Sequence, residues 1–375
     1  MPDLSFRSFK AWEQPQDVII PADELIQMYE SGYSGIVLDE SIRERDKELF
    51  NASNTIRYGS DVCRLMRYEE TAKGELITPF VHILDRYPLS LPGPAQERGD
   101  CVSHGQKNSN LGTMVLEAVL GKPDEVSNKL EECPTVSELG EKNGVLSTEA
   151  LYWYRGYNGD GWTCAASARV SKTSAGAVLR QAYPEADIDL SAYSGSLAGK
   201  YGSRKPPTAI ADALDNHLFR EATEVDSKEV CRDLMARGFF QNSCGSEGFA
   251  KRKDENGVSS RSGSWGHSMA YIAVDDRPWA YDTYGDMLVL VLNSWGKAWN
   301  GGGRDIYDSA KYVPPGKVAD WIAKGIVNAA TGNIMIPLGA FWARWKDLRK
   351  RYTVAMAGLN GWERESLVDW LGGYR

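Results

Sequence analysis

The sequence has few histidines and no excess of positive charge. Only 4 of its 375 residues are histidine, and 43 lysines and arginines stand against 51 aspartates and glutamates, a formal net charge of −8. A protein that binds nucleic acid needs a basic face from which counterions are released. The composition therefore predicts no nucleic-acid partner.

A basic run near the C-terminus is the local exception. It contains Arg344, Lys346, Arg349, Lys350 and Arg351, with Trp342 and Trp345 among them. Such runs usually form the solvated side of a helix whose aromatic residues face the core. We expect that arrangement here and keep an interaction patch as the alternative.

Long apolar runs are also missing. No segment offers the ~18 uninterrupted apolar residues of a membrane span, and the start Met1-Pro2-Asp3-Leu4 lacks a positive flank followed by an apolar stretch. We therefore expect no membrane association, no secretion signal and a cytoplasmic location.

Metal and disulfide signatures are absent as well. The cysteines, at positions 63, 101, 133, 164, 231 and 244, are scattered and form no Cys-x-x-Cys pair. This spacing argues against a disulfide framework and a structural zinc site, and favours free thiols in a reducing compartment. A metal site of Cys231, Cys244 and His267 lacks ligand spacing, and no Gly-x-x-x-x-Gly-Lys loop is present. We expect no metal and no organic cofactor.

What is present is the composition of an ordinary globular protein, with 42% hydrophobic and 25% charged residues. Residues 1–90 are interpreted as an N-terminal extension with helices over Ala22–Tyr29 and Ser41–Phe50 and a strand over Ile77–Leu84. A proline-rich passage, Leu89–Pro94, separates this extension from the rest.

Residues 91–225 are expected to form a helical lobe. Leu111, Met114, Val115, Ala118 and Val119 follow the spacing of one buried helix face, so a helix should run from Cys101 to the stop at Gly121-Lys122-Pro123. Further helices are expected over Ser167–Tyr183 and Pro206–Arg220.

Residues 226–375 change to short β-prone runs. Strands are expected over Met269–Val274, Met287–Leu292 and Met335–Phe341, with a hairpin through Asp275-Asp276-Arg277-Pro278 and a last helix over Trp362–Trp370. This part should form a β-rich lobe with a helical tail.

Cys101 follows Gly99-Asp100 at the start of the predicted helix. Unpaired backbone N–H groups and the positive end of the helix dipole favour a thiolate there, and a thiolate is a competent nucleophile. The alternative for a lone cysteine is a buried, inert side chain.

His267 begins a β-prone run beside Trp265 and Gly266, and Asn293 ends the next apolar strand. A histidine can act as a general base, and an asparagine oxygen can hold its ring in the tautomer that faces a thiol. The alternative for His267 is a hydrogen-bonded core residue. His104, three residues after Cys101, could pair with the thiol or a metal, but is rather expected to line a cleft.

Four short motifs follow one another along the chain, and their order indicates a family. They are Cys101 at a helix start, Gly156-Tyr157-Asn158-Gly159, His267-Ser268-Met269-Ala270 and Asn293-Ser294-Trp295-Gly296. Over residues 95–300 the chain resembles the papain-like cysteine peptidases. The resemblance implies an α+β fold in which a helical lobe and a β-barrel-like lobe meet at an active-site cleft.

The resemblance also implies roles for individual residues. Cys101 is similar to the family's nucleophile, His267 to its base, Asn293 to its ring-orienting residue and Gln96 to the glutamine of its oxyanion hole. Trp295 resembles the tryptophan that shields the Asn–His hydrogen bond. The loop with Gly156, Asn158 and Gly159 resembles the glycine loop along which an extended substrate lies.

Four features depart from the family's pattern. Gln96 lies five residues before Cys101 rather than six, Val102 replaces a tryptophan, and Arg98 and Tyr157 stand where many relatives have a disulfide. The gap between His267 and Asn293 is longer than usual, which is interpreted as an extended hairpin.

The resemblance predicts a cysteine peptidase that cleaves peptides or proteins through a covalent acyl-enzyme. The N-terminal extension is expected to be a propeptide that covers the cleft or a tethering arm. The alternative function is a papain-like scaffold for assembly, with protein partners and little or no hydrolysis, because several motifs resemble papain-like proteins of bacteriophages and bacteria; a virion location goes with it.

Overall fold

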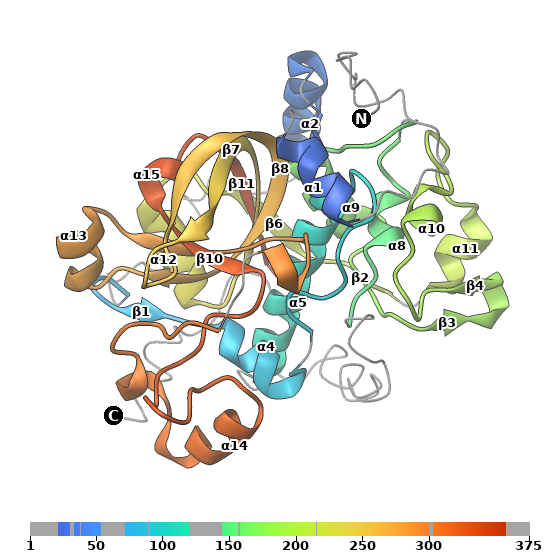
Figure 1. Cartoon of the computed structure of the whole chain (residues 1–375). Coiled ribbons are helices and arrows are strands. Elements are labelled where there is room, and N and C mark those ends of the chain that lie inside the picture. The colour runs from blue at the N-terminus through green and yellow to red at the C-terminus, as the bar shows by residue number, and fades with distance from the viewer. Residues whose placement is uncertain are drawn as a thin grey trace.

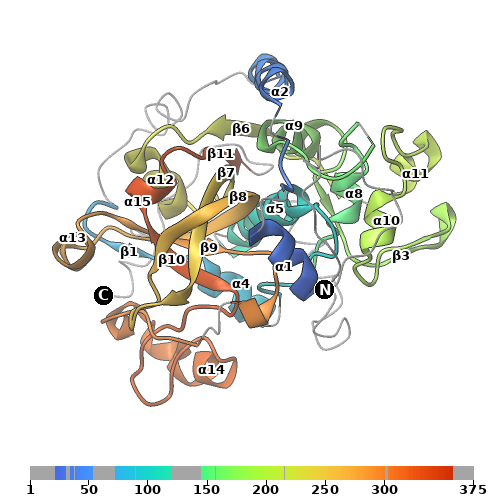
Figure 2. The ribbon, with the colours of Figure 1, turned by 45° about the horizontal axis from the view of Figure 1, so that its top comes forward.

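The structure is a computed structural model, and it describes residues 22–30, 34–37, 39–53, 72–88, 90–119, 145–156, 158–214, 216–299 and 303–357. A sheet lies on one side of the molecule and a group of short helices on the other, with the long helix α5 between them (Figure 1). The helix α1 lies at the junction of the two sides and packs against strand β8 (Figure 2).

The N-terminal extension contains both predicted helices, α1 (Ala22–Glu30) and α2 (Glu40–Ala52). Asp39 begins α2 by accepting hydrogen bonds from the backbone N–H groups of Ser41 and Ile42. The strand predicted over Ile77–Leu84 is wrong. Only β1 (Leu76–Ile77) is extended, and α4 (Phe80–Arg86) follows; its residues 80–84 are all buried, and the helix packs against α5.

The helical side is built around α5 (Cys101–Val119), which begins at the predicted residue. Its other helices are α8 (Glu149–Tyr152), α9 (Cys164–Thr173), α10 (Gly195–Gly199) and α11 (Thr208–Ala213), and its short strands are β2 (Ala177–Val178), β3 (Ala182–Tyr183), β4 (Ile188–Asp189) and β5 (Asn216–His217). The two predicted helices after α5 are therefore shorter than expected. Ser174 ends α9, and Pro207 allows α11 to begin only at Thr208.

The sheet contains β6 (Glu221–Glu224), β7 (Gln241–Lys253), β8 (Ser259–Asp275), β9 (Leu288–Leu292), β10 (Ala340–Arg344) and β11 (Tyr352–Ala357). Its antiparallel order is β10-β9-β8-β7-β11-β6, with β1 paired to β8. Because β10 and β6 lie at opposite ends, the sheet is open and the expected barrel-like lobe is not confirmed.

Several helices connect or cover these strands: α12 (Lys228–Ala236), α13 (Pro278–Tyr284), α14 (Val318–Ala323) and α15 (Trp345–Leu348). The strands β8 and β9 form the expected hairpin, and α13 lies in the connection between them. The strand predicted over Met335–Phe341 lies later, in β10. The predicted helix Trp362–Trp370 lies outside the described residues.

The core lies on both faces of the sheet. In β9, Leu288, Leu290 and Leu292 pack into one buried cluster, whereas Val289 and Val291 pack into the other. A strand buried on both faces reads as an unbroken apolar run, and that run is what the sequence shows. The central strand β8 is positioned by β9, and it carries His267.

A disulfide joins the two sides of the molecule. Cys164 of α9 and Cys244 of β7 are bonded, with their sulfur atoms 2.09 Å apart. The expectation that all cysteines are free thiols is therefore wrong for this pair, which are 80 residues apart and give no spacing signal. Cys101 and Cys231 are free, and Cys63 and Cys133 lie outside the described residues. In the described part of the chain no helix is long and apolar enough to cross a membrane.

Candidate active site

Cys101 lies at the first residue of α5 and is completely buried. Its sulfur accepts a hydrogen bond from the backbone N–H of Ser268, at 3.3 Å. Ser268 follows His267 on β8, so this contact brings the helix start and the histidine strand together. The two segments are 167 residues apart in the sequence.

His267 is held by Asn293. The two side chains meet through His267 Nε2 and Asn293 Oδ1 at 2.8 Å, and the same oxygen accepts the backbone N–H of Ser294 at 2.7 Å. Since the amide oxygen can only accept, Nε2 carries the proton and Nδ1 carries the lone pair. Among the described residues Nδ1 is buried without a hydrogen-bond partner. The ring is therefore set in the tautomer that can take a proton through Nδ1.

An aromatic cluster covers this hydrogen bond. The ring centroid of Trp295 lies 4.5 Å from that of His267, with the two planes tilted by 31°. It also lies 4.9 Å from the ring centroids of Trp265 and Trp299. All three tryptophans are buried. Excluding water strengthens the polar contact between His267 and Asn293. The shielding role that the resemblance implies for Trp295, and a substrate-binding role for it, stay predictions.

Gln96 is completely buried and lies within the same site. Its amide nitrogen donates to the Tyr29 hydroxyl at 3.2 Å and to the Arg98 carbonyl at 2.8 Å, and its amide oxygen accepts from the Ser294 hydroxyl. A bond from the Gln96 backbone N–H to the Ser294 carbonyl, at 2.9 Å, fixes the segment. Although Gln96 lies five rather than six residues before Cys101, its side-chain amide nitrogen points toward the Tyr29 hydroxyl within the site.

Tyr29 of α1 fills the centre of the site, which sequence analysis did not foresee. Its ring lies 4.8 Å from His267 and 5.2 Å from Trp295. Its hydroxyl is hydrogen-bonded to the Cys101 thiol as well as to Gln96. The only sequence signal is that Tyr29 belongs to the apolar face of its helix.

Residues 34–37 lie beside Tyr29 and bind both sides of the site through their backbone. Gly35 N–H donates to the Gly266 carbonyl at 2.7 Å, Val37 N–H donates to the Trp162 carbonyl at 3.0 Å, and Trp162 N–H donates to the Gly35 carbonyl at 3.3 Å. The segment bends at Gly35 and forms isolated parallel bridges, from Ser34 to Gly266 and from Ile36 to Trp162. The backbone of residues 34–37 is therefore hydrogen-bonded between Gly266 on one side and Trp162 on the other.

Close packing at Gly35 makes this fit tight. A Cβ at position 35 would lie 2.0 Å from the Tyr29 hydroxyl oxygen and 2.7 Å from the Cys101 sulfur. Real Cβ atoms do not approach so closely, so only glycine allows the segment to lie against the thiol.

Burial under this segment keeps the thiol and the imidazole uncharged. It raises the pKa of Cys101 to about 12, although the Tyr29 hydroxyl, the Ser268 N–H and Arg351 oppose the rise. It lowers the pKa of His267 to about 3, with Asn293 opposing and Arg351 adding to the fall. At neutral pH the buried pair is therefore a thiol and a neutral imidazole.

Arg351 is a second residue that the sequence analysis missed, because it was assigned to a solvated helix face. Its guanidinium is buried directly beneath the histidine strand and donates to the carbonyls of His267 at 2.5 Å and Ser243 at 3.0 Å. Gly245, opposite His267 in the strand pairing, leaves room for it: a Cβ there would lie 2.5 Å from Arg351 Cγ. An arginine immediately before the β-prone run Tyr352–Ala357 was the available signal.

The glycine loop contacts the site through its far end. Gly161 and Trp162 lie next to residues 34–37, whereas Gly156 is exposed, and Asn158 is exposed and accepts from the Ser203 N–H at 3.0 Å. Gly159 accepts from the Arg155 side chain at 3.0 Å. The predicted substrate role of these three residues stays a prediction.

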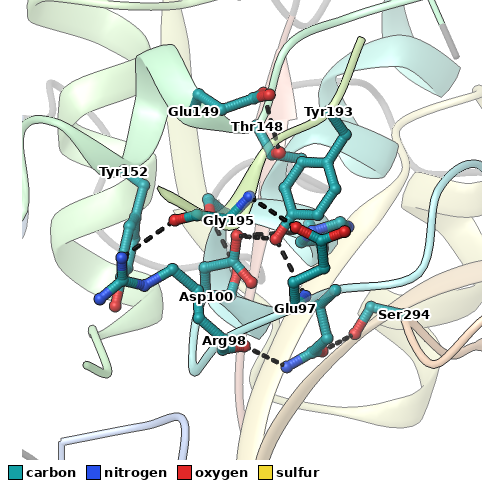
Figure 3. Close-up of polar contacts among 12 residues, drawn as sticks. Glu97, Arg98, Asp100, Thr148, Glu149, Tyr152, Tyr193, Gly195 and Ser294 are labelled. Carbon is teal, nitrogen blue, oxygen red and sulfur yellow. Dashed lines mark hydrogen bonds and ion pairs between the residues drawn. The ribbon is translucent and has the colours of Figure 1, made fainter. Parts of the chain in front are cut away.

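An ion pair joins the loop before Cys101 to the glycine loop, near the place where many papain-like relatives have a disulfide. Arg98 contacts Asp160 at 2.6 Å, with both side chains almost fully buried. Figure 3 shows the neighbouring contacts: Tyr193 donates to Asp100 at 2.8 Å, and Glu97 accepts from the Gly195 N–H at 2.9 Å. These bonds fix the loop that leads into Cys101.

His104 lies on this side, with its Nε2 3.5 Å from Asp100 Oδ2 and its ring 5.0 Å from that of Tyr193. It therefore contacts the loop network. Among the described residues no group of three His, Cys, Asp or Glu side chains could hold a metal ion.

Comparisons with known proteins give structural neighbours only. No protein-family model and no curated protein matches the chain. Similar solved structures include xylellain, a cysteine protease of Xylella fastidiosa, at 10% identity and TM-score 0.39, covering 72% of this chain and 85% of that one. Another is the cysteine protease and lectin-like domains of a surface layer associated protein of Clostridium difficile, at 16% identity and TM-score 0.36, covering 72% and 50%. A third is the cysteine protease that is a major ragweed pollen allergen, in its proform, at 10% identity and TM-score 0.38, covering 75% and 65%.

These three neighbours are cysteine proteases. With identities no higher than 16% and TM-scores no higher than 0.39, they do not establish an activity for this chain. The activity has to be argued from the side chains of the site.

Proposed function

We propose that the protein is a cysteine peptidase in which Cys101 is the nucleophile, His267 the general base and Asn293 the residue that orients the imidazole. One arrangement carries the proposal: the Ser268 N–H meets the Cys101 sulfur at 3.3 Å, while the adjacent His267 is held by Asn293 at 2.8 Å with Nδ1 left to accept a proton. A nucleophile, a base and an orienting group in this relation are the requirements of covalent catalysis.

In the reaction, His267 Nδ1 takes the proton of the Cys101 thiol, and the thiolate attacks the carbonyl carbon of a peptide bond. The tetrahedral intermediate collapses when the carbon–nitrogen bond breaks, and His267 gives its proton to the leaving amine. His267 then takes a proton from water, whose oxygen attacks the thioester. Collapse of this second intermediate releases the carboxylic acid and returns the proton to Cys101.

Gln96 would stabilise the negative oxygen of both intermediates. Its amide nitrogen now donates to the Tyr29 hydroxyl at 3.2 Å, and that hydroxyl is also bonded to the thiol. A substrate oxygen in the same position would accept from Gln96, together with the backbone N–H of Cys101. Such a donor typically contributes about 3 kcal/mol to the transition state.

Mass spectrometry can test the proposal directly. A Gly35→Ala variant, in which the added Cβ should displace residues 34–37 from the site, is incubated with a peptide mixture, and new peptide termini are identified. We expect hydrolysis that stops in proportion to the alkylation of Cys101. Hydrolysis that continues after complete alkylation of Cys101 would rule out this nucleophile.

We further propose that the N-terminal segment keeps the enzyme latent. Tyr29 and residues 34–37 fill the site and bond to both of its walls, and the burial they create leaves thiol and imidazole uncharged. The segment acts as an inhibitory propeptide rather than as a simple tether. Displacing it would admit water and substrate together.

Gly35→Ala is expected to open the site, because the added Cβ cannot lie 2.0 Å from the Tyr29 hydroxyl oxygen. We expect the rate at which iodoacetamide alkylates Cys101 to rise at least about tenfold near pH 6, where a freed thiolate–imidazolium pair would react. Gly316→Ala is the matched control, since nothing lies within 4 Å of a Cβ at that position. Equal rates in the two variants would contradict the inhibitory role.

The alternative function, a scaffold for assembly, gains no support from the described residues. It predicts a Cys101 thiol that stays inert in the opened protein as well. The same alkylation experiment therefore separates the two functions.

A further inference from the structure

A second pocket lies at the far end of the β7–β8 hairpin, away from the candidate active site. It has a volume of about 890 Å³ and is lined by residues 250–255 and 258–260, by Tyr284 at the end of α13, and by Arg304 and Arg344. This volume is within the range of sites that bind ligands.

The lining of this hairpin pocket is basic, although the whole chain carries a net charge of −8. Its cations are Lys251, Arg252, Lys253, Arg304 and Arg344, and its carboxylates are Asp254 and Glu255. Arg344 is already paired with Asp347 at 2.7 Å, so the excess of positive charge comes from the other four cations. Like charges gathered in one concave site repel one another, and a bound anion relieves that repulsion.

The nearest carboxylate is already engaged in the hairpin turn. One oxygen of Asp254 accepts the backbone N–H groups of Asn256 at 3.0 Å and Val258 at 2.8 Å, and the other accepts the Tyr284 hydroxyl at 2.8 Å. Both oxygens of Asp254 are therefore hydrogen-bonded within the hairpin turn and to α13. Glu255 is exposed at the tip.

The contacts of Arg304 and Lys253 indicate that the hairpin pocket can bind an anion. Within the described residues, Arg304 Nη1 is buried without a hydrogen-bond partner. Lys253 Nζ donates to the Ala340 carbonyl at 3.0 Å, and burial together with the nearby Arg304 lowers its pKa to about 7. A buried guanidinium donor without a hydrogen-bond partner, in a pocket that also contains the Lys253 ammonium, is suited to bind an anion.

We propose that the hairpin pocket binds an acidic segment of a protein through carboxylates paired with Arg304 and Lys253. The volume of about 890 Å³ exceeds what one small anion fills. A segment with several carboxylates can also pair with Lys251 and Arg252, which are exposed in the lining.

This site does not depend on peptidase activity, so the two proposals can fail separately. The full-length protein is titrated against a fluorescent peptide of alternating glutamate and serine, and against its glutamine counterpart, by fluorescence anisotropy. We expect saturable binding of the glutamate peptide that weakens as salt rises, and no saturable binding of the glutamine peptide.

Arg304→Gln and Lys253→Gln should each weaken binding about tenfold, the effect of losing one charge-assisted pair. Arg252→Gln, at an exposed position, gives a variant that does not disturb packing and should weaken binding by a smaller factor. Arg204→Gln is the matched control, because Arg204 is exposed on the helical side, and should bind as the unchanged protein does.

Affinities that are equal for the two peptides, or unchanged by Arg304→Gln and Lys253→Gln, would overturn the proposal. Saturable binding of inorganic phosphate without any binding of the glutamate peptide would overturn it too, because the pocket would then be a small-anion site.

Discussion

Replacing Cys101 by alanine is expected to lower kcat/KM for a peptide substrate at least about 10⁴-fold in the Gly35→Ala protein, because no other group can form the covalent intermediate. Cys231→Ala is the matched control. Cys231 is also free and fully buried, but it lies on α12 and its backbone carbonyl accepts from Gln241. The same loss of a buried sulfur there should leave kcat/KM nearly unchanged.

Rates for both variants are measured with one fluorogenic peptide and corrected for the folded fraction from thermal denaturation. Activity retained by Cys101→Ala would contradict the assignment of the nucleophile. An equal loss in Cys231→Ala would show that the effect comes from packing.

Arg351→Met is expected to have the second largest effect. The substitution leaves the buried carbonyls of Ser243 and His267 without their donor, which should lower the free energy of unfolding by about 3 kcal/mol or more. It also releases the backbone of the strand that carries His267. A small displacement of the base should reduce kcat by about 10²-fold.

The charge of Arg351 has a separate signature in the pH profile. The cation lowers the pKa of both Cys101 and His267, so its removal should raise both values and move the whole profile to higher pH. The expected shift is on the order of one pH unit. Arg351→Lys keeps the charge without the planar fork, so it should lose stability and kcat but keep the position of the profile.

A purely structural role for Arg351 predicts an unshifted profile in the methionine variant. That result would remove the electrostatic part of the interpretation while leaving the packing part. A methionine variant as stable and active as the unchanged protein would contradict both parts.

The features that local sequence could predict are those set by neighbours in the chain. A helix beginning at Cys101 follows from its apolar spacing, and β9 follows from an unbroken run of leucine and valine. The meeting of His267 with Asn293 was predictable because consecutive strands usually pair, which carries the two side chains to the same place.

Features set by distant contacts were not predictable. Tyr29 is one aromatic residue on a short amphipathic helix, and nothing nearby indicates that it contacts His267, 238 positions later in the numbering. Arg351 is charged, so burial was not expected from its type, and only the carbonyls gathered around it make burial favourable. The Cys164–Cys244 bond likewise depends on the packing of α9 against β7.

Local signals also failed where two structures suit the same residues. Ile77–Leu84 is apolar enough for a strand, but Pro79 and the spacing of Phe80, Ile83 and Leu84 fit the helix that packs against α5. Gly156–Gly159 matches the family's loop in composition, yet the backbone that is hydrogen-bonded to Gly35 and Val37 belongs to Trp162.

The most direct test of the central claim is the rate of Cys101 alkylation by iodoacetamide between about pH 4 and 9, with the modified residue located by mass spectrometry. In the unchanged protein the pKa of Cys101 is about 12, so labelling should be slow and should rise throughout this range. In Gly35→Ala, labelling should be fast and nearly constant from about pH 5 to 8, and His267→Ala should abolish this plateau. Labelling that rises in both proteins only near the ordinary thiol pKa of ~8.5 would show that Cys101 and His267 form no reactive pair.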